Sequence, residues 1–372
     1  MLGLLIPSLS VRPLAGYGEK SPACFLVEIE GRRFLLDLGE EPATGRLPEL
    51  SEAGHIDAVL ISHGHADHVG GLRALDSIGN PPVYASAMVR ALGDAPLRSA
   101  RDLPVRGRIT IGGVEIETGQ SGHAPGAVWI RVGGPAGVLY SGDFSREGTL
   151  FAFDVPLPAR YLIVDASYGT YDEPLERTVD MLARMARSGP LLLPTQPNGR
   201  GLEMAVHFHE RNIPIALCDN HIAIARRVLE SDQGVLNDNA TDRLSAAVAA
   251  AVDYARVESS YGAILAADGS AASGLSETLQ ATFLERRLPV IFTSTPAEKS
   301  GAGEAIASGH AHFSRWNVHP RLRDLRWLVE CVQPDITMPA FLRKGEIEKL
   351  PRDFIVPAVT DLKLSPDGSR DR

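Results

Sequence analysis

The stretch His63-Gly64-His65-Ala66-Asp67-His68 decides the fold of this chain, because it gathers three imidazoles and a carboxylate within six residues. It follows the apolar run Ala58-Val59-Leu60-Ile61-Ser62, which is typical of a buried strand. Residues two apart in an extended segment point the same way, so His63 and His65 can bind one ion. Asp67 and His68, which follow one turn later, can bind a second ion. Imidazole nitrogen and carboxylate oxygen together suit zinc best, with manganese or iron as further options. The sequence therefore predicts a metal site where a strand ends.

Composition limits the class of protein. The chain has 372 residues, 44% of them hydrophobic and 22% charged, which is typical of a soluble globular protein with one large domain or two ordinary ones. Three scattered cysteines, Cys24, Cys218 and Cys331, favour a reducing compartment over a disulfide framework, so we expect a cytoplasmic location. Residues 1–10 predict a first strand and not a signal peptide, and no run is long enough to span a membrane. The net charge of −9 argues against a general polycation but permits a local basic groove.

The pattern of elements changes after Glu173. Up to about residue 165 the chain predicts short strands separated by turns, with few helices. From Glu173 to about residue 310, helical stretches alternate with buried strands. Asp242 to Val257 is one of the expected helices, and Leu191-Leu192-Leu193 is one of the expected strands. Such alternation predicts a parallel sheet covered by helices. A last helix around Leu325 then leads into a final strand at 335–338.

The spacing His-x-His-x-Asp-His resembles the metallo-β-lactamase superfamily, and further parts of that family's pattern follow in its order. Asp37 ends an early strand, His123 lies in the turn Ser121-Gly122-His123-Ala124-Pro125-Gly126, and Asp143 follows Leu139-Tyr140-Ser141-Gly142. The resemblance implies that Asp37 fixes a ligand imidazole. It also implies two ion sites that share Asp143: His63, His65 and His123 for the first, and Asp67, His68 and Asp143 for the second.

The later part of the chain resembles the β-CASP branch of that superfamily, which includes RNase J and Artemis. Val164-Asp165-Ala166-Ser167-Tyr168-Gly169 is similar to its motif A, Gly199-Arg200 with Glu203 to its Gly-Arg-x-x-Glu helix start, and Asn317-Val318-His319 to motif B. The motif C histidine falls on Phe341, and members that act on DNA also lack that histidine. The resemblance implies an α/β protein: a metallo-β-lactamase αββα sandwich formed by residues 1–173 and 313–372, with residues 174–312 as an inserted β-CASP-like domain.

The function implied by this resemblance is a metal-dependent nuclease that hydrolyses phosphodiester bonds of nucleic acid. Zinc lowers the pKa of a bound water to about 7 and so supplies a hydroxide. We expect His319 to act as general acid with Asp165 orienting it, and Asp67 and Asp37 complete the expected catalytic set. Because Phe341 replaces the motif C histidine, we slightly favour single-stranded or end-frayed DNA over RNA as the substrate. Phe341 also leaves the second ion with fewer ligands, so we expect that ion to bind more weakly than the first.

Alternative interpretations stay open at this point. The same zinc centre could hydrolyse a small phosphodiester or an acyl compound, or the chain could be a weakly active binding subunit of a nucleic-acid-processing complex; a homodimer or a partner protein is equally open. Asp37 and Asp165 could merely end strands, and His319 could merely begin a helix. Arg200 and Glu203 favour a solvated helix face or an ion pair. Four of the remaining histidines are expected to be exposed: His55, His207, His209 and His221. One of the other two, His310 or His312, could complete the second site.

Overall fold

The structure is a computed structural model that describes residues 9–231, 234–296, 300–352, 362–364 and 370–371. Contacts divide the chain into two units, the first made of Met1–Arg146, Phe153–Asp172 and His319–Arg372, and the second of Glu147–Ala152 and Glu173–Val318. The expected domain ranges stay a prediction; the units depart from them because two short segments, 147–152 and 313–318, belong to the second unit. Among the described residues, no helix combines the length and the apolarity that a membrane crossing needs.

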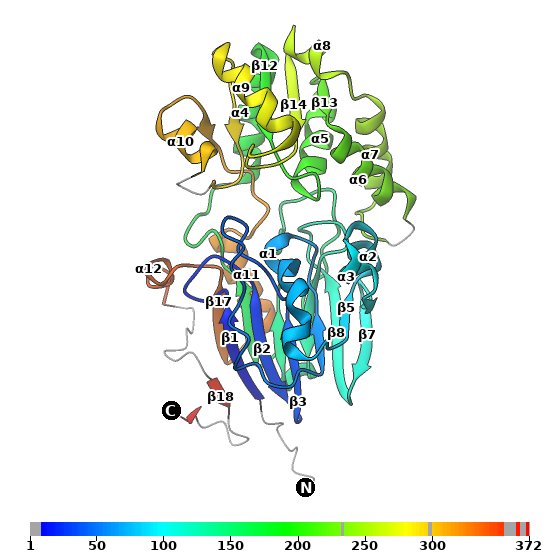
Figure 1. Cartoon of the computed structure of the whole chain (residues 1–372), viewed down its shortest axis with the longest axis vertical. Helices are drawn as coiled ribbons and strands as arrows, with labels where there is room; N and C mark the ends of the chain where they lie inside the picture. The colour runs from blue at the N-terminus through cyan, green and yellow to red at the C-terminus, as the bar shows by residue number, and fades with distance from the viewer. Residues whose placement is uncertain (1–8, 232–233, 297–299, 353–361, 365–369, 372) are drawn as a thin grey trace. The chain divides into compact units, whose positions relative to one another are not determined.

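Two sheets form the centre of the first unit (Figure 1). The first has the order β19-β18-β1-β2-β3-β4-β5-β6 and the second the order β17-β11-β10-β9-β8-β7. Parallel pairing joins β3, β4, β5 and β6 in the first sheet and β10, β11 and β17 in the second. The bounds are as follows: β1 Leu9–Ala15, β2 Cys24–Ile29, β3 Arg32–Leu36, β4 Ala58–Leu60, β5 Val83–Ala85, β6 Arg101–Asp102, β18 Leu362–Leu364, β19 Arg370–Asp371, β7 Gly107–Ile111, β8 Val114–Gln120, β9 Val128–Val132, β10 Val138–Tyr140, β11 Tyr161–Asp165 and β17 Ile336–Ala340.

Alternation of side chains along these strands builds four layers. Phe25 and Val27 of β2 face the same apolar cluster as Tyr140 of β10 and Ile163 of β11, so the two sheets pack face to face. On the outer face of the first sheet a second cluster reaches the helical segments α1 (Ala66–Val69), η1 (Gly70–Ile78), α2 (Ala87–Leu92) and α3 (Ala95–Arg98). On the outer face of the second sheet, a third cluster includes Leu325 and Leu328 of α11 (Leu322–Val332). The expected αββα sandwich is therefore confirmed.

The second unit is an α/β assembly around a three-stranded parallel sheet of order β12-β14-β13. Its strands and helices are β12 Pro190–Pro194, β13 Ile215–Leu217, β14 Gly262–Ala266, the parallel pair β15 Ile291–Phe292 and β16 His312–Phe313, α4 Leu175–Ser188, α5 Arg200–Glu210, α6 Asp219–Glu230, α7 Ala240–Ala249, α8 Tyr254–Glu258, α9 Gly274–Glu285 and α10 Gly301–Ala307. The parallel sheet expected for the insertion is present.

One expected helix is wrong, because Asp242 to Val257 is not continuous. It divides into α7 and α8. The backbone N–H of Val252 donates to the carbonyl of Ile215, 2.8 Å away, and the Asp253 carboxylate accepts from the N–H of Ala255 at the start of α8. An aspartate that caps a new helix interrupts the old one, since its side chain offers the backbone a competing hydrogen bond.

Glu203 holds the segment 147–152 to the second unit. Its carboxylate accepts from the backbone N–H groups of Thr149 at 3.2 Å and Leu150 at 2.8 Å, and Arg243 donates to the Thr149 carbonyl. The side chain is buried, so the expected solvated helix face is wrong for this residue. A buried carboxylate needs such donors because losing its water is costly. Glu203 is therefore a structural residue of the second unit.

We predict that Glu203→Ala lowers the free energy of unfolding by about 1–3 kcal/mol, since two backbone donors lose their acceptor. Burial raises the pKa of Glu203 above its usual value despite these hydrogen bonds, so the folded state keeps the proton to higher pH than the unfolded state. Stability should therefore fall as pH rises from about 4.5 through the raised pKa, and Glu203→Gln should not show that fall. Denaturant unfolding at pH 5 and pH 8 measures both effects, and an alanine variant as stable as the wild type contradicts the assignment.

Candidate metal centre

The site residues follow the carboxyl ends of parallel strands. Asp37 follows β3, and Ser62 and His63 follow its neighbour β4. In the second sheet, Asp143 lies beyond the end of β10, Asp165 ends β11 and Phe341 follows β17. Polar side chains gather there because the carboxyl ends of adjacent parallel strands share one edge of the sheet.

Close backbone contacts hold the histidine-rich turn in place. The N–H groups of Ala23 and Leu38 donate to the carbonyls of Asp67 and His68 at 2.8 and 3.0 Å. Gly39 lies so close that a Cβ atom on it would be 1.7 Å from the Asp67 carbonyl oxygen. Only glycine permits this approach, which explains why a glycine follows Asp37 and Leu38.

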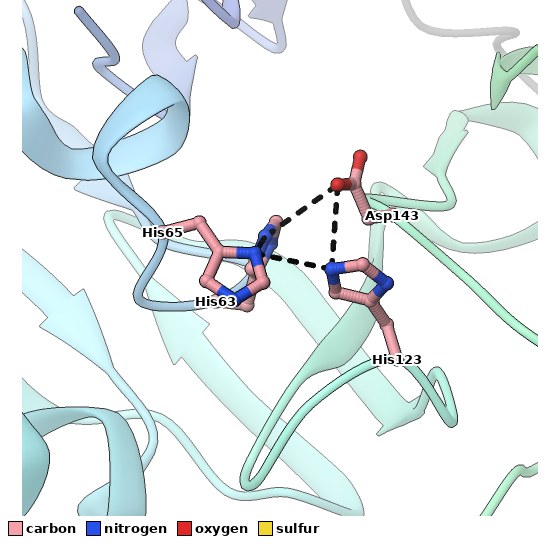
Figure 2. Close-up of side chains that lie close together, drawn as sticks. All are labelled: His63, His65, His123 and Asp143. Atoms are coloured by element: carbon pink, nitrogen blue, oxygen red, sulfur yellow. Dashed lines mark hydrogen bonds and ion pairs between the residues drawn. The ribbon is translucent and has the colours of Figure 1, made fainter. Parts of the chain in front are cut away.

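Four side chains converge on one point, which we call the first ion position: His63, His65, His123 and Asp143 (Figure 2). The Nδ1 atom of His65 lies 3.1 Å from Nε2 of both His63 and His123, and Asp143 Oδ2 lies 3.6 and 3.5 Å from the same two atoms. Ligands that surround an ion tetrahedrally at 2.0–2.1 Å are roughly 3.4 Å apart. The spacing of these donors therefore fits a single ion such as zinc.

The charge state of His63 suits a metal ligand. Its side chain is fully buried, and this burial, reinforced by the neighbouring imidazoles, holds the pKa of His63 well below its usual value. The ring is therefore neutral at pH 7. A neutral imidazole is the form that binds a metal.

Asp67 and His68 lie near the other oxygen of Asp143, and we call these three residues the second ion position. Among the described residues they do not form a ligand group as compact as the first; the other compact group that includes Asp143 is with Asp165 and His319. His68 Nε2 is 3.3 Å from Asp143 Oδ1 and 4.0 Å from Asp67 Oδ2. The two oxygens of Asp143 thus face different positions, as a shared ligand requires. Burial lowers the pKa of His68, but the carboxylates of Asp143, Asp37 and Asp67 outweigh it and hold that pKa well above its usual value. The surroundings therefore favour positive charge here, whether a proton or a metal cation.

Phe341 packs against the second ion position. Its ring centroid is 5.4 Å from that of His68, and the side chain is buried. The residue has φ +63°, and its N–H donates to the Gly16 carbonyl at 2.7 Å. Left-handed φ is unusual for a large side chain, so the surrounding structure must hold it there. The phenyl ring of Phe341 has no lone pair to donate to a metal. Its position beside His68 supports the expectation that a second ion would have fewer ligands.

His319 lies beside the first ion position and pairs with Asp165. Its Nδ1 is 2.8 Å from Asp165 Oδ2 and 3.7 Å from Asp143 Oδ2, and its side chain is 19% exposed. Burial opposes ionisation of Asp165, yet His319 and the N–H and hydroxyl of Ser167 together lower the pKa of Asp165. The carboxylate thus stays charged and directs the His319 ring, which also packs against Tyr168 with centroids 5.1 Å apart. Sequence reasoning did not single out the supporting roles of Ser167 and Tyr168, although both belong to the motif A stretch.

The remaining histidines divide differently from the expectation. His55 is exposed and His209 is half-buried, but His207 and His221 are buried, so their expected exposure is wrong. The His207 ring packs on Trp316, and burial lowers the pKa of His207 to about 4. In His221, Nδ1 lies 3.0 Å from Cys218 Sγ, and burial lowers the pKa of His221 to about 3. His310 and His312 are exposed in the second unit, and neither belongs to a potential metal-ligand cluster of the described residues.

Comparison with known proteins finds one superfamily and several relatives that resemble part of the chain. Residues 17–193 match the metallo-beta-lactamase superfamily. Ribonuclease TTHA0252 of Thermus thermophilus is 27% identical over 59% of this chain and 60% of its own length. Cleavage and polyadenylation specificity factor 73 of Drosophila melanogaster and endoribonuclease YSH1 of Candida glabrata are each 26% identical, over 54% and 61% of this chain but only 36% and 37% of their own lengths. The chain thus spans less than two thirds of these curated relatives.

A solved structure supports the fold over nearly the whole chain. A protein of unknown function from Enterococcus faecalis V583 is similar with a TM-score of 0.59 and 15% identity, covering 95% of this chain and 98% of that one. The order of the metal-facing residues, the four layers and these similarities agree with one another. Residues 17–193 are therefore a metallo-β-lactamase superfamily domain, and the chain is similar to proteins named as a ribonuclease and an endoribonuclease.

Proposed function

We propose that the protein is a metal-dependent nuclease that hydrolyses phosphodiester bonds of nucleic acid. The observation that carries the proposal is the convergence of His63, His65, His123 and Asp143, whose ligand atoms all lie within 4.8 Å of one another. The relatives named as a ribonuclease and an endoribonuclease support the same class of reaction. The proposed substrate is single-stranded or end-frayed nucleic acid. The slight preference for DNA rests on Phe341, whereas the names of these relatives favour RNA.

Two metal ions, zinc in our proposal, would supply the chemistry by lowering the pKa of a bound water to about 7 so that hydroxide is available at neutral pH. His63, His65 and His123 would hold the first ion, Asp67 and His68 the second, and Asp143 would contribute one oxygen to each. These donors are oriented before any ion arrives, because most of them are buried against the strand ends. Such preorganisation reduces the cost of assembling the site.

His319 is the proposed general acid. The Nδ1 proton of His319 is directed at Asp165, so Nε2 is the atom that would donate a proton to the leaving oxygen of the phosphodiester. The partial exposure of His319 gives a substrate access to it, whereas Asp165 is fully buried and acts only through the ring. Asp37 has a supporting role, because it accepts from His68 Nδ1 at 2.7 Å. Asp67, which we place with the metal ligands, contributes to catalysis through the second ion.

The substrate class can be tested with end-labelled single-stranded DNA and RNA of equal sequence, each with added zinc, with added manganese and with chelator. We expect cleavage that a chelator abolishes and that added metal restores. Failure to cut either polymer under any of these conditions contradicts the proposal. A clear preference for RNA would remove the argument from Phe341 and keep the reaction class.

We predict that His65→Ala and Asp67→Ala each abolish hydrolysis without unfolding the protein, because both side chains line the metal positions and neither lies in an apolar core. His55→Ala and Asp76→Ala are matched controls, since both residues are exposed and have no part in the proposed site. Turnover and thermal unfolding are measured on all four variants. Wild-type turnover in either of the first two would show that the site is misassigned.

For His319→Ala we expect turnover to fall by about 10²–10⁴-fold, the usual contribution of a general acid, while metal content stays at the wild-type value. Single-turnover rates and metal analysis of the same preparation separate the two effects. A variant that loses its metal together with its activity would make His319 a ligand and not a proton donor.

Unequal binding of the two ions is a further prediction, and it follows from Phe341. The purified protein should hold between one and two ions per chain, rising toward two with added metal. Phe341→His should tighten the second ion, because histidine adds a donor and tolerates left-handed φ better than phenylalanine does. Phe341→Leu, which offers no donor, is the control. Equal occupancy in the histidine and leucine variants would show that position 341 does not face the ion.

A further inference from the structure

Asp37 receives four hydrogen bonds although it is completely buried. The backbone N–H of Ser62 donates to Oδ1 at 2.7 Å. The other oxygen, Oδ2, has the Ser62 hydroxyl at 2.6 Å, Nδ1 of His68 at 2.7 Å and the Tyr140 hydroxyl at 2.7 Å. This one carboxylate therefore links β3, the turn after β4 and the end of β10.

The protons of this cluster can be assigned from the number of donors. A carboxylate has no proton to give, so the single hydroxyl proton of Ser62 points to Asp37. Ser62 Oγ also lies 3.1 Å from His63 Nδ1, and with its own proton in use it can only accept there. The proton of the neutral His63 ring is therefore on Nδ1. Its Nε2 keeps a free lone pair on the side of His65 and Asp143.

The same carboxylate orients His68. Nδ1 of that ring donates to Asp37 Oδ2, so Nε2 faces Asp143 Oδ1 at 3.3 Å. The Tyr140 hydroxyl, which is buried and comes from the second sheet, donates to the same Oδ2 and so fixes the oxygen on which both rings depend. One imidazole at each ion position thus has its proton and its ring plane set from Asp37, directly for His68 and through Ser62 for His63.

We propose that Ser62 and Tyr140 are positioning residues that, through the single carboxylate of Asp37, orient one imidazole ligand at each of the two ion positions. The inference rests on the metal centre of the proposed function, but not on what that centre hydrolyses. It has a specific consequence. Loss of the Ser62 hydroxyl should weaken the first ion, through His63, far more than the second ion, whereas loss of the Asp37 carboxylate should weaken both ions strongly.

The chain offers a matched control for each residue. Ser121 is fully buried and lies two residues before the proposed ligand His123, yet its hydroxyl has no hydrogen-bond partner among the described residues. Tyr161 is fully buried on β11, beside β10, and within the described part of the chain its hydroxyl is likewise without a partner. Replacing these two residues removes the same atoms from the same kind of surroundings without touching Asp37.

The experiment measures zinc affinity of the metal-free full-length protein by competition with a coloured chelator, together with the visible spectrum of the cobalt form. Ser62→Ala should weaken the first ion by about 10–100-fold, the usual effect of losing a group that orients a ligand, and should weaken the second ion by a smaller factor, because Asp37 keeps its other donors beside His68. Tyr140→Phe should weaken both ions by a smaller factor, because Asp37 keeps its other donors. Ser121→Ala and Tyr161→Phe should bind both ions as the wild type does.

A double variant tests the route through Asp37. If Ser62 acts through that carboxylate, Ser62→Ala combined with Asp37→Ala should weaken the first ion no more than Asp37→Ala alone. The inference is overturned if Ser62→Ala and Ser121→Ala bind zinc equally well, or if Tyr140→Phe and Tyr161→Phe do. If Ser62→Ala does not fold, the comparison of the two tyrosine variants alone is the test. A wild-type protein that binds ions but cuts no nucleic acid overturns the proposed function only, whereas one that binds no ion overturns both.

Discussion

The metal-facing edge of this protein depends on one constraint, which is that buried polar groups must be paired. His63, His68, Asp37 and Asp165 are all buried at the ends of strands, where each would be costly without partners. Asp37 pairs with His68, and Asp165 pairs with His319. Ser62 and Tyr140 complete Asp37, and Ser167 completes Asp165. The Nε2 atom of His63 and the two oxygens of Asp143 face the proposed ion positions, and the carboxylates around His68 favour positive charge there.

The packing of two sheets makes this arrangement possible. The first sheet supplies Asp37 and the histidine-rich turn, the second supplies Asp143 and Asp165, and the apolar cluster between the sheets fixes their separation. Phe341 belongs to that same apolar cluster although it also packs on His68. In the proposed two-ion site, Phe341 would therefore connect the packing of the sandwich to the binding of the second ion.

Much of the site could be predicted from the sequence because its chemistry is local. The spacing within residues 63–68 places several donors on one turn. Short apolar runs predict the strands that precede Asp37, His123 and Asp143. What failed depends on distant contacts. The burial of His207 and His221 follows from which face of α5 and α6 packs inward, and the role of Glu203 from the return of segment 147–152 to the second unit. The use of Ser62 and Tyr140 needed the distance between two sheets, which no local pattern contains.

We propose that the cluster at the strand ends binds metal. Anomalous diffraction at the zinc edge, from crystals of the zinc-loaded protein, locates bound zinc directly. We expect a strong peak bonded to His63, His65, His123 and Asp143, and a weaker second peak bonded to Asp67, His68 and the other oxygen of Asp143. A zinc-loaded crystal with no peak at this cluster, or with its zinc bound elsewhere on the chain, would rule out the proposed metal centre.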